Sequence, residues 1–299
     1  YNILDQVEEE SAKTSAPNSG AEEILEWLKN RDIKIGVITR NALQPVIRSM
    51  ENFDRISMDD FGVVISREDP IQPKPSPEGI YRAMEQLQVN SDEAIMVGDY
   101  LFDMAAANGA EVTSILIPPA GKQKDTSTWG QDHLITELIE LKEIIEYRLP
   151  LPAGKLPNRY LDHFLATLNI GDPSVLVAPG VGEDTAAVSV EKEEVLVLKS
   201  DPVTFVSDTA ARFAVTVNAN DIATSGAIPR WFLSTLLFPV STTPWEVLTV
   251  MTELQHHCQQ LGITLCGGHT EITDAVTRPV ISGMVVGTVA KKHLIDKQN

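Results

Sequence analysis

The chain has 299 residues, of which 43% are hydrophobic and 22% are charged, a composition typical of folded domains. Its formal net charge of −18 argues against a nucleic-acid or anionic-membrane partner, because such a surface repels phosphate groups. Its 2 cysteines and the absence of a secretory-signal pattern favour a cytoplasmic location. The longest apolar stretch, near residues 231–240, is about half the roughly 20 residues of a membrane-spanning helix, so we expect no membrane association.

The first half of the chain alternates helical and strand patterns. Short apolar runs typical of buried strands occur at 33–39, 61–66, 94–99 and 112–117. Helical patterns are expected at 21–30, 42–50, 76–87, 102–110 and 134–147. Strands that alternate with helices predict βαβ units with right-handed crossovers. Residues 1–147 are therefore expected to form an α/β domain built on a doubly wound parallel sheet.

A domain boundary is predicted where three prolines, Pro150, Pro152 and Pro157, occur within eight residues. We take 148–157 as a linker and 158–299 as a second domain. Its pattern predicts an α+β fold, with strands at 174–179, 185–190, 194–200, 230–239, 263–268 and 279–289 and helices at 209–227 and 244–261.

A first group of candidate site residues falls at one edge of the predicted parallel sheet. Thr39 and Asp99 each end a strand, and ligands bind at the carboxyl ends of parallel strands. Lys74 lies in a proline-flanked loop before a helix, and Asp103 would lie one turn after Asp99. A hydroxyl, a cation and two carboxylates on one edge suit a phosphoryl group with Mg²⁺, which favours oxygen ligands. Singly, each could be an ordinary turn residue or surface charge.

The segments "GVITRN", "KPSPEG" and "MVGDYLFD" together resemble the second, third and fourth motifs of the haloacid dehalogenase superfamily of phosphohydrolases. The resemblance covers about residues 15–120. It implies that Thr39 and Lys74 hold the phosphoryl oxygens and that Asp99 and Asp103 support Mg²⁺. It also implies an aspartate nucleophile in an Asp-x-Asp motif, which forms an aspartyl-phosphate.

That first motif does not occur in residues 1–299. Asp5 is the only early candidate, and neither an apolar strand precedes it nor an Asp-Gly follows it. The polar segment 1–16 looks like the end of a small cap. We therefore expect the nucleophile to lie upstream in a longer protein, or this half to be a degenerate relative.

A second group of polar residues follows in the second half. Glu183 and Asp184 are adjacent in a glycine turn, and Asp201 ends a strand. Asn218 and Asp221 are three residues apart and would share one face of an apolar helix, where unpaired polar groups are costly. In "CGGHTEIT", a strand is expected to end in a glycine turn whose amides can approach a phosphate. Several acids beside such a turn suggest Mg²⁺ bound with a nucleotide triphosphate; a strand-end turn for Asp201 and a packing hydrogen bond for Asn218 are the alternatives.

The segments "GEDTAAV", "SDPVTF", "NANDIATSGAIPRW" and "GGHTEIT", in this order over about 174–289, resemble the N-terminal domain of the aminoimidazole ribonucleotide synthetase (PurM-like) superfamily, and most closely its HypE branch. The resemblance implies ATP with Mg²⁺ and a homodimer that pairs its sheets. It implies that the acidic residues Asp184, Asp201 and Asp221 bind the metal or lie at the phosphate site. It places Asn218, Gly267, Gly268 and Thr270 near the nucleotide.

The resemblance is partial, because the family's second domain and the cysteine-bearing HypE tail are not found in residues 1–299. Thiocarboxamide chemistry is therefore not expected. His256, His257, Cys258, Cys266 and His269 lack the paired spacing of zinc ligands, so we expect an exposed histidine pair at 256–257 and Cys258 in the core.

The leading hypothesis is a fragment of a bifunctional, Mg²⁺-dependent enzyme that joins a phosphoester hydrolase to an ATP-using PurM-like half. Its substrate would be a small phosphorylated molecule. The alternative is a nucleotide-binding or assembly module whose first half is a non-catalytic docking domain.

Overall fold

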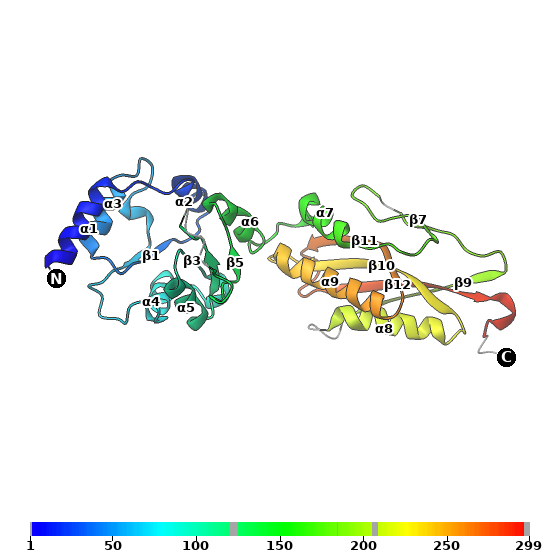
Figure 1. The fold of residues 1–299 in the computed structure, drawn as a ribbon. Coiled ribbons are helices and arrows are strands. Elements are labelled where there is room, and N and C mark those ends of the chain that lie inside the picture. Colours follow the sequence, from blue (N-terminus) through cyan, green and yellow to red (C-terminus); the bar gives the residue numbers. More distant parts are fainter. Residues whose placement is uncertain (1, 120–124, 184, 205–208, 296–299) are drawn as a thin grey trace. The chain divides into compact units, whose positions relative to one another are not determined.

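A computed structural model describes the chain except for residues 1, 120–124, 184, 205–208 and 296–299 (Figure 1). The chain forms two compact units, Tyr1–Ile144 and Ile145–Asn299. The second unit starts earlier than expected, and the segment 148–157 is part of it rather than a free linker. Leu151 and Leu156 of this segment are buried in the core of the second unit.

The first unit contains short strands, each separated from the next by helical segments. The helices are α1 (Asn2–Thr14), α2 (Ala21–Lys29), α3 (Leu43–Met50), α4 (Glu78–Leu87), α5 (Leu101–Gly109) and α6 (Leu141–Glu146). The strands are β1 (Gly36–Ile38), β2 (Val63–Ile65), β3 (Ile95–Gly98), β4 (Thr113–Leu116) and β5 (His133–Leu134). Three 3₁₀ turns, Met58–Asp60, Ser91–Glu93 and Leu138–Glu140, complete it.

All strand pairs of the first unit are parallel, as the alternating pattern predicts, and the α/β class is confirmed. The strands form two sheets, β1-β2 and β3-β4-β5, instead of one. Among the described residues no strand pairs with the second edge of β1 or of β3. Ile38 of β1 and Met96 of β3 nevertheless pack against the same buried cluster from α4 and α5. The two open edges therefore border one core.

The region expected as a helix over 134–147 differs. His133 and Leu134 are extended and pair with β4, and regular helix begins only at Leu141. The Glu140 carboxylate accepts hydrogen bonds from the backbone N–H of Thr136 at 2.8 Å and of Glu137 at 2.7 Å. This side-chain cap fixes a turn there, so the helix cannot extend back to residue 134.

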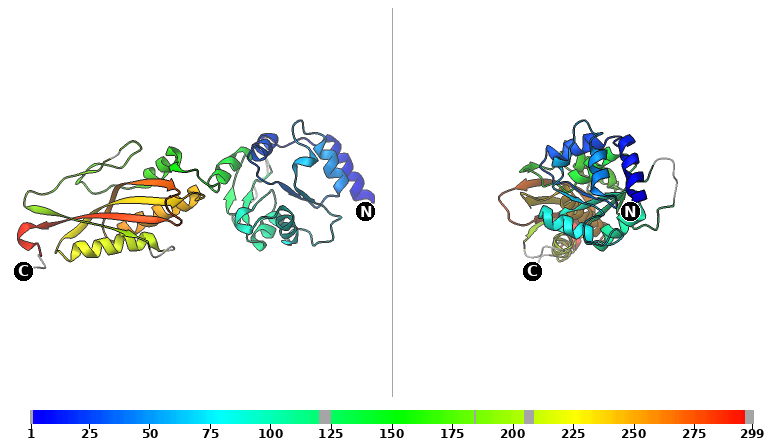
Figure 2. Two further views of the ribbon diagram at one scale, coloured as in Figure 1. Left: turned by 180° about the vertical axis from the view of Figure 1, so that it is seen from behind. Right: turned by 90° about the vertical axis from the view of Figure 1, so that its left-hand side faces the viewer.

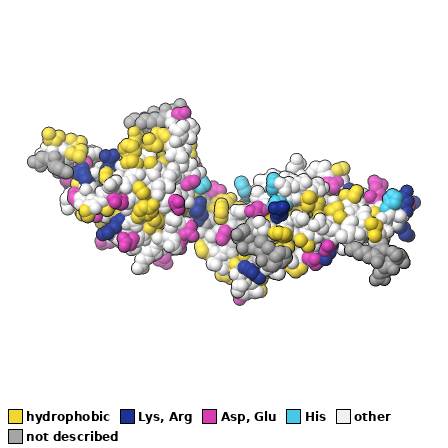
Figure 3. All heavy atoms as spheres, turned by 90° about the horizontal axis from the view of Figure 1, so that it is seen from below, with side chains coloured by type: hydrophobic (Ala, Val, Ile, Leu, Met, Phe, Trp, Pro, Cys, Tyr) yellow, Lys and Arg dark blue, Asp and Glu magenta, His cyan; other side chains and the backbone are white. Residues whose placement is uncertain are grey.

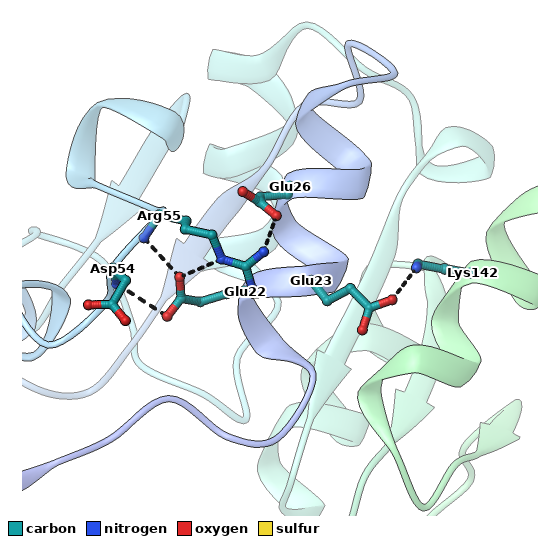
Figure 4. A network of polar contacts seen from close by, with 6 residues as sticks. All are labelled: Glu22, Glu23, Glu26, Asp54, Arg55 and Lys142. Atoms are coloured by element: carbon teal, nitrogen blue, oxygen red, sulfur yellow. Dashed lines mark hydrogen bonds and ion pairs between the residues drawn. The ribbon is translucent and has the colours of Figure 1, made fainter.

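Acidic residues of α2 attach it to two other segments of the first unit (Figure 4). Glu22 accepts from the backbone N–H groups of Asp54 at 3.2 Å and Arg55 at 2.8 Å. The Arg55 guanidinium also pairs with Glu26 at 2.5 Å, and Lys142 pairs with Glu23 at 2.7 Å. These bonds hold α2 against the loop after α3 and against α6.

The second unit consists of a five-stranded main sheet, a two-stranded hairpin and helices packed on the main sheet. Its strands are β6 (Gly154–Lys155), β7 (Val175–Val177), β8 (Ala187–Val188), β9 (Glu194–Val203), β10 (Ile228–Pro239), β11 (Thr264–Thr273) and β12 (Val280–Ala290). Its helices are α7 (Asn158–Thr167), α8 (Ala210–Ala223) and α9 (Pro244–Gln260), followed by a 3₁₀ turn at Lys291–His293. The α+β class is confirmed.

The main sheet has the order β6-β11-β10-β12-β9, in which only β10 and β11 run parallel. Both α8 and α9 cover the same face, as Figures 1 and 2 show from opposite sides. A small hairpin, β7-β8, covers part of the other face, where Val175 and Val188 pack on Trp231 and Cys266. The large core therefore lies between the sheet and its helices.

The surface is mixed in character. On the face drawn in Figure 3, Lys and Arg side chains lie mostly apart, among acidic and apolar ones. Within the described parts of the chain, no helix combines the length and the hydrophobicity needed to cross a bilayer.

Candidate functional site

The Lys74 ammonium connects two elements of the first unit. Its Nζ donates to the carbonyl oxygen of Ile38, the last residue of β1, at 2.9 Å. It also lies 2.6 Å from Oδ1 of Asp103, in the first turn of α5. The Lys74 and Asp103 side chains are only 15% and 7% exposed, so this pair is largely desolvated. The structure thus brings together a cation and a carboxylate that are 29 positions apart in the sequence.

Asp103 is held by a second bond, because its Oδ2 accepts from the backbone N–H of Tyr100 at 3.0 Å. The approach of β3 to α5 also requires a glycine at position 98. A Cβ on Gly98 would overlap the Asp103 side chain, with Oδ2 only 2.7 Å away. Gly98, the glycine in "MVGD", therefore leaves the space that the Asp103 side chain occupies.

Thr39 and Asp99 lie at the strand ends where the sequence placed them. Thr39 follows β1, and its backbone N–H donates to the Ile65 carbonyl at 2.9 Å. Its hydroxyl accepts from the backbone N–H of Asn41 at 3.1 Å. Asp99 directly follows β3 and is exposed, and among the described residues it has no hydrogen-bond or ion-pair partner. Its carboxylate is therefore accessible to a ligand.

Within the described residues, no three His, Cys, Asp or Glu side chains gather as a ready metal site. Asp99 is a free oxygen donor of the type Mg²⁺ prefers, while both oxygens of Asp103 already have partners. Asp99 is therefore the carboxylate of this group that remains available to a metal ion, whereas Asp103 holds Lys74.

In the second unit, one ammonium group connects two of the predicted acids. Lys199 Nζ lies 2.8 Å from Oδ2 of Asp201 on β9 and 2.9 Å from Oδ2 of Asp221 on α8. The hydrogen bonds to Asp201 and then Asp221 raise the pKa of Lys199. The two carboxylates therefore converge on a position that accommodates one cation. Lys199 was not among the site residues predicted from the sequence. Its position two residues before Asp201 on a strand nevertheless places both side chains on one face of the sheet.

Asn218 is fully buried and binds protein backbone. Its Oδ1 accepts from the Asp201 N–H at 2.9 Å, and its Nδ2 donates to the carbonyl oxygens of Asp201 at 3.4 Å and Ala214 at 2.8 Å. The amide predicted to lie near a nucleotide thus fixes the backbone of Asp201. This matches the requirement that a polar group inside an apolar helix face be paired.

The predicted glycine turn "GGHTE" is wrong, because β11 continues to Thr273. A bulge at Cys266 shifts the register against β10, so that Gly268 faces Ser234. A Cβ on Gly268 would overlap the Ser234 carbonyl oxygen, whereas one on Gly267 would meet only ordinary contacts at 3.7 Å. Gly268 is therefore needed for strand packing, and Thr270 lies farther along β11, opposite Leu236.

The remaining predicted residues are placed as follows. Glu183 is exposed in the loop between β7 and β8, and Asp184 lies outside the described residues. Cys258 is fully buried, as expected, and His256 and His257 lie near the end of α9. Burial raises the pKa of Cys258 to about 12 and that of Cys266 to about 11.

Two family matches cover different parts of the chain. Residues 1–117 match the family described as haloacid dehalogenase-like hydrolase. Residues 182–289 match the N-terminal domain of AIR synthase related protein. The first match contains Thr39, Lys74, Asp99 and Asp103, and the second contains Lys199, Asp201 and Asp221.

Individual proteins are similar to parts of this chain. A pyrophosphatase PpaX of Halalkalibacterium halodurans is 24% identical over 135 residues, 44% of this chain and 61% of the relative. A selenide, water dikinase of Carboxydothermus hydrogenoformans is 33% identical over 148 residues, 47% of this chain and 43% of the relative. The crystal structure of the hydrogenase maturation protein HypE in complex with ATP aligns with a TM-score of 0.37 and 16% identity, over 45% of this chain and 41% of that one.

The chain spans between 43% and 61% of the length of these two curated relatives, each of which is named as an enzyme. The two family matches fall one in each compact unit. The chain therefore carries a region that matches the haloacid dehalogenase-like hydrolase family toward its N-terminal side and a region that matches the N-terminal domain of AIR synthase related protein toward its C-terminal side.

Proposed function

We propose that the first unit contributes phosphoryl-binding groups to a phosphoester or phosphoanhydride hydrolase. The observation that carries this is the Lys74 ammonium, held at the end of β1 by Ile38 and Asp103. A desolvated cation at the carboxyl edge of parallel strands stabilises negative charge that develops on a phosphoryl group. The Thr39 hydroxyl, on the residue after Ile38, supplies a hydrogen bond to the same group. The name of the PpaX relative suggests inorganic pyrophosphate as the first substrate to test.

The nucleophilic aspartate of this reaction is proposed to lie outside residues 1–299. Support comes from the open edges of β1 and β3, which border one buried cluster in the described structure. A parallel strand inserted there would pair with both edges and would end beside Lys74. Such a strand could present a carboxylate to the phosphoryl site.

Mg²⁺ is proposed as the cofactor, with Asp99 as its ligand from this chain. When bound, the ion would neutralise charge on the phosphoryl oxygens. Asp103 has a different task, because its two oxygens hold Lys74 and the Tyr100 amide. It orients the ammonium toward the edge of the sheet.

The test is Mg²⁺-dependent hydrolysis of pyrophosphate and p-nitrophenyl phosphate by the protein encoded in its complete reading frame. Asp99→Asn is expected to reduce kcat by about 100-fold, the upper end of the loss that follows mutation of groups supporting a bound metal. The matched control is Asp92→Asn, an exposed aspartate just before β3, which should hydrolyse at the wild-type rate. Unchanged turnover in Asp99→Asn would refute the assignment. Inactivity of the wild type on all phosphate esters tested would favour the docking-module alternative.

We propose that the second unit binds ATP with Mg²⁺ at Asp201 and Asp221. Their carboxylates already share one cation, which supports a cation position between β9 and α8. Titration calorimetry with Mg²⁺ and ATP should show binding to the wild type and at least about tenfold weaker binding to Asp221→Ala. Asp274→Ala, in an exposed turn, is the control. Equal heats from wild type and Asp221→Ala would contradict the nucleotide site.

A homodimer through the second unit is also proposed. Leu196 and Leu198 alternate with core-facing Val195 and Val197, so they lie on the sheet face opposite α8 and α9. They are 46% and 59% exposed, and Met284 of the neighbouring strand is 37% exposed. An open apolar sheet face is typical of an interaction surface. Light scattering should show Leu198→Asp as monomeric and the control Leu261→Asp, at the end of α9, as dimeric.

A further inference from the structure

The cation position of the second unit is occupied by a side chain of the chain itself. Lys199 contacts Asp201 at 2.8 Å and Asp221 at 2.9 Å, and all three side chains remain partly exposed, at 31%, 43% and 45%. Among the described residues no other ammonium or guanidinium pairs with these two acids. A metal ion that takes the position between the two Oδ2 atoms must therefore displace the Lys199 ammonium.

The formal charges decide when such a displacement is favourable. Two carboxylates and one ammonium give a local charge of −1. A divalent ion arriving alone would make it +1, with two cations competing for two carboxylates. Like charges a few ångströms apart repel one another, more strongly near a protein surface than in bulk water. A divalent ion that arrives with a polyphosphate brings anionic oxygens that can pair with the released ammonium.

The Lys199 side chain has the reach for this exchange. Its backbone is fixed in β9 by pairing with Val285 of β12, while its four-carbon stem is flexible and its ammonium is a mobile point charge. Movement of the stem keeps the ammonium on the face of β9 that carries Asp201. The displaced Lys199 ammonium thus remains close to any phosphate that accompanies the metal ion.

We propose that Lys199 is a displaceable counter-ion that makes divalent-metal binding at Asp201 and Asp221 depend on a bound phosphate chain. This inference rests on the proposed nucleotide function of the second unit. It adds a specificity determinant: the site rejects free metal ions and takes a metal together with a nucleoside triphosphate.

The test compares Mn²⁺ binding in the presence and absence of a non-hydrolysable ATP analogue, with free Mn²⁺ measured by its electron paramagnetic resonance signal. For wild type, Mn²⁺ alone should bind weakly, and the analogue should strengthen binding. In Lys199→Met, Mn²⁺ alone should bind about tenfold more tightly than in wild type, and the strengthening by the analogue should shrink by a similar factor. Lys199→Arg retains the charge and should resemble wild type.

The control is Lys192→Met, which removes an exposed lysine just before β9 and should leave both affinities unchanged. Thermal melts by circular dichroism establish that each variant is folded, and Lys199→Gln replaces the Met variant if that one is not. Equal Mn²⁺ affinity in wild type and Lys199→Met, with the analogue still bound, overturns the counter-ion role alone. Failure of wild type to bind the analogue with Mn²⁺ overturns the proposed nucleotide function and this inference with it.

Discussion

Lys74 and Asp103 form a largely desolvated ion pair, with 2.6 Å between Nζ and Oδ1, across the space between a loop and the start of α5. Each partner also binds backbone: Lys74 donates to the Ile38 carbonyl and Asp103 accepts from the Tyr100 amide. Both partners therefore have a backbone hydrogen bond besides the ion pair, and the positions of their charged groups are fixed before any ligand binds.

The first prediction concerns the stability that this pair requires. Asp103→Ala leaves a desolvated ammonium without its counter-charge, so the free energy of unfolding of the first unit should fall by about 3 to 5 kcal/mol. The measurement is urea denaturation followed by circular dichroism. Glu10→Ala, which breaks the solvent-exposed pair with Lys13, should leave the midpoint unchanged. If the two variants unfold at the same urea concentration, the Lys74 pair has no special structural role.

A second prediction uses two adjacent glycines of β11. Gly268→Ala should destabilise the second unit by about 2 kcal/mol or more, because its Cβ would overlap the Ser234 carbonyl oxygen. Gly267→Ala should cost less than about 1 kcal/mol, since its Cβ would meet Leu233 and Ala186 at ordinary distances of 3.7 and 3.8 Å. Thermal melting of both variants without ligand decides this. A larger loss for Gly267→Ala would contradict the packing argument.

A third prediction addresses the buried amide of Asn218. Asn218→Ala removes its bonds to Asp201 and Ala214 and leaves a cavity, so stability should fall by about 2 to 3 kcal/mol. Because the same bonds hold the Asp201 backbone, Mg²⁺–ATP binding should weaken as well. Calorimetry on Asn218→Ala at a temperature where it is folded measures this second effect. Thr252→Ala, which removes an exposed hydroxyl that bonds to the Leu248 carbonyl on α9, is the control and should keep wild-type affinity.

The buried thiols give a prediction about pH. Both Cys258 and Cys266 keep their protons in the folded state well above the usual pKa of 9.0, because burial disfavours the thiolate. Iodoacetamide should therefore modify neither thiol at pH 8 until the protein unfolds. Modification at equal rates in the folded and urea-unfolded protein would show that the thiols are accessible.

The raised pKa values of the two thiols also determine how the stability of the fold changes with pH. Below pH 9 both states hold the thiol protons, and the folded state keeps its full stability. Above pH 9 the unfolded chain loses them while the folded chain retains them, so stability falls by about 1.4 kcal/mol per pH unit for each thiol. Between pH 9 and 11, Cys258→Ala should lose stability less steeply than wild type in urea denaturation. Parallel slopes would contradict the raised pKa.

Much of the order of helices and strands was predictable because it follows from the local periodicity of apolar residues. The alternation of apolar runs and helical segments located β1 to β4 and α2 to α5 within a few residues. The same reasoning failed at His133 and Leu134, where pairing with β4 outweighs helical spacing. It also ended β11 too early at Gly268, because a strand neighbour rather than a turn demands that glycine.

The sequence indicated which residues belong to the candidate sites, but not which of them contact each other. Position at a strand end identified Thr39, Asp99 and Asp201, and the face of α8 identified Asn218 as a residue in need of a bond. The sequence could not show that Asn218 binds the Asp201 backbone or that Lys199 lies between two acids. Those contacts join residues up to 22 positions apart through the packing of α8 on β9.

The open edges of β1 and β3 also predict a second way for the chain to associate in solution. Free main-chain N–H and C=O groups on an edge accept almost any extended segment, including one from a second copy. Association of this kind depends little on side chains and would be relieved by a peptide that completes the sheet. Species larger than a dimer that such a peptide dissociates would therefore report on the first unit, independently of the apolar face of the second.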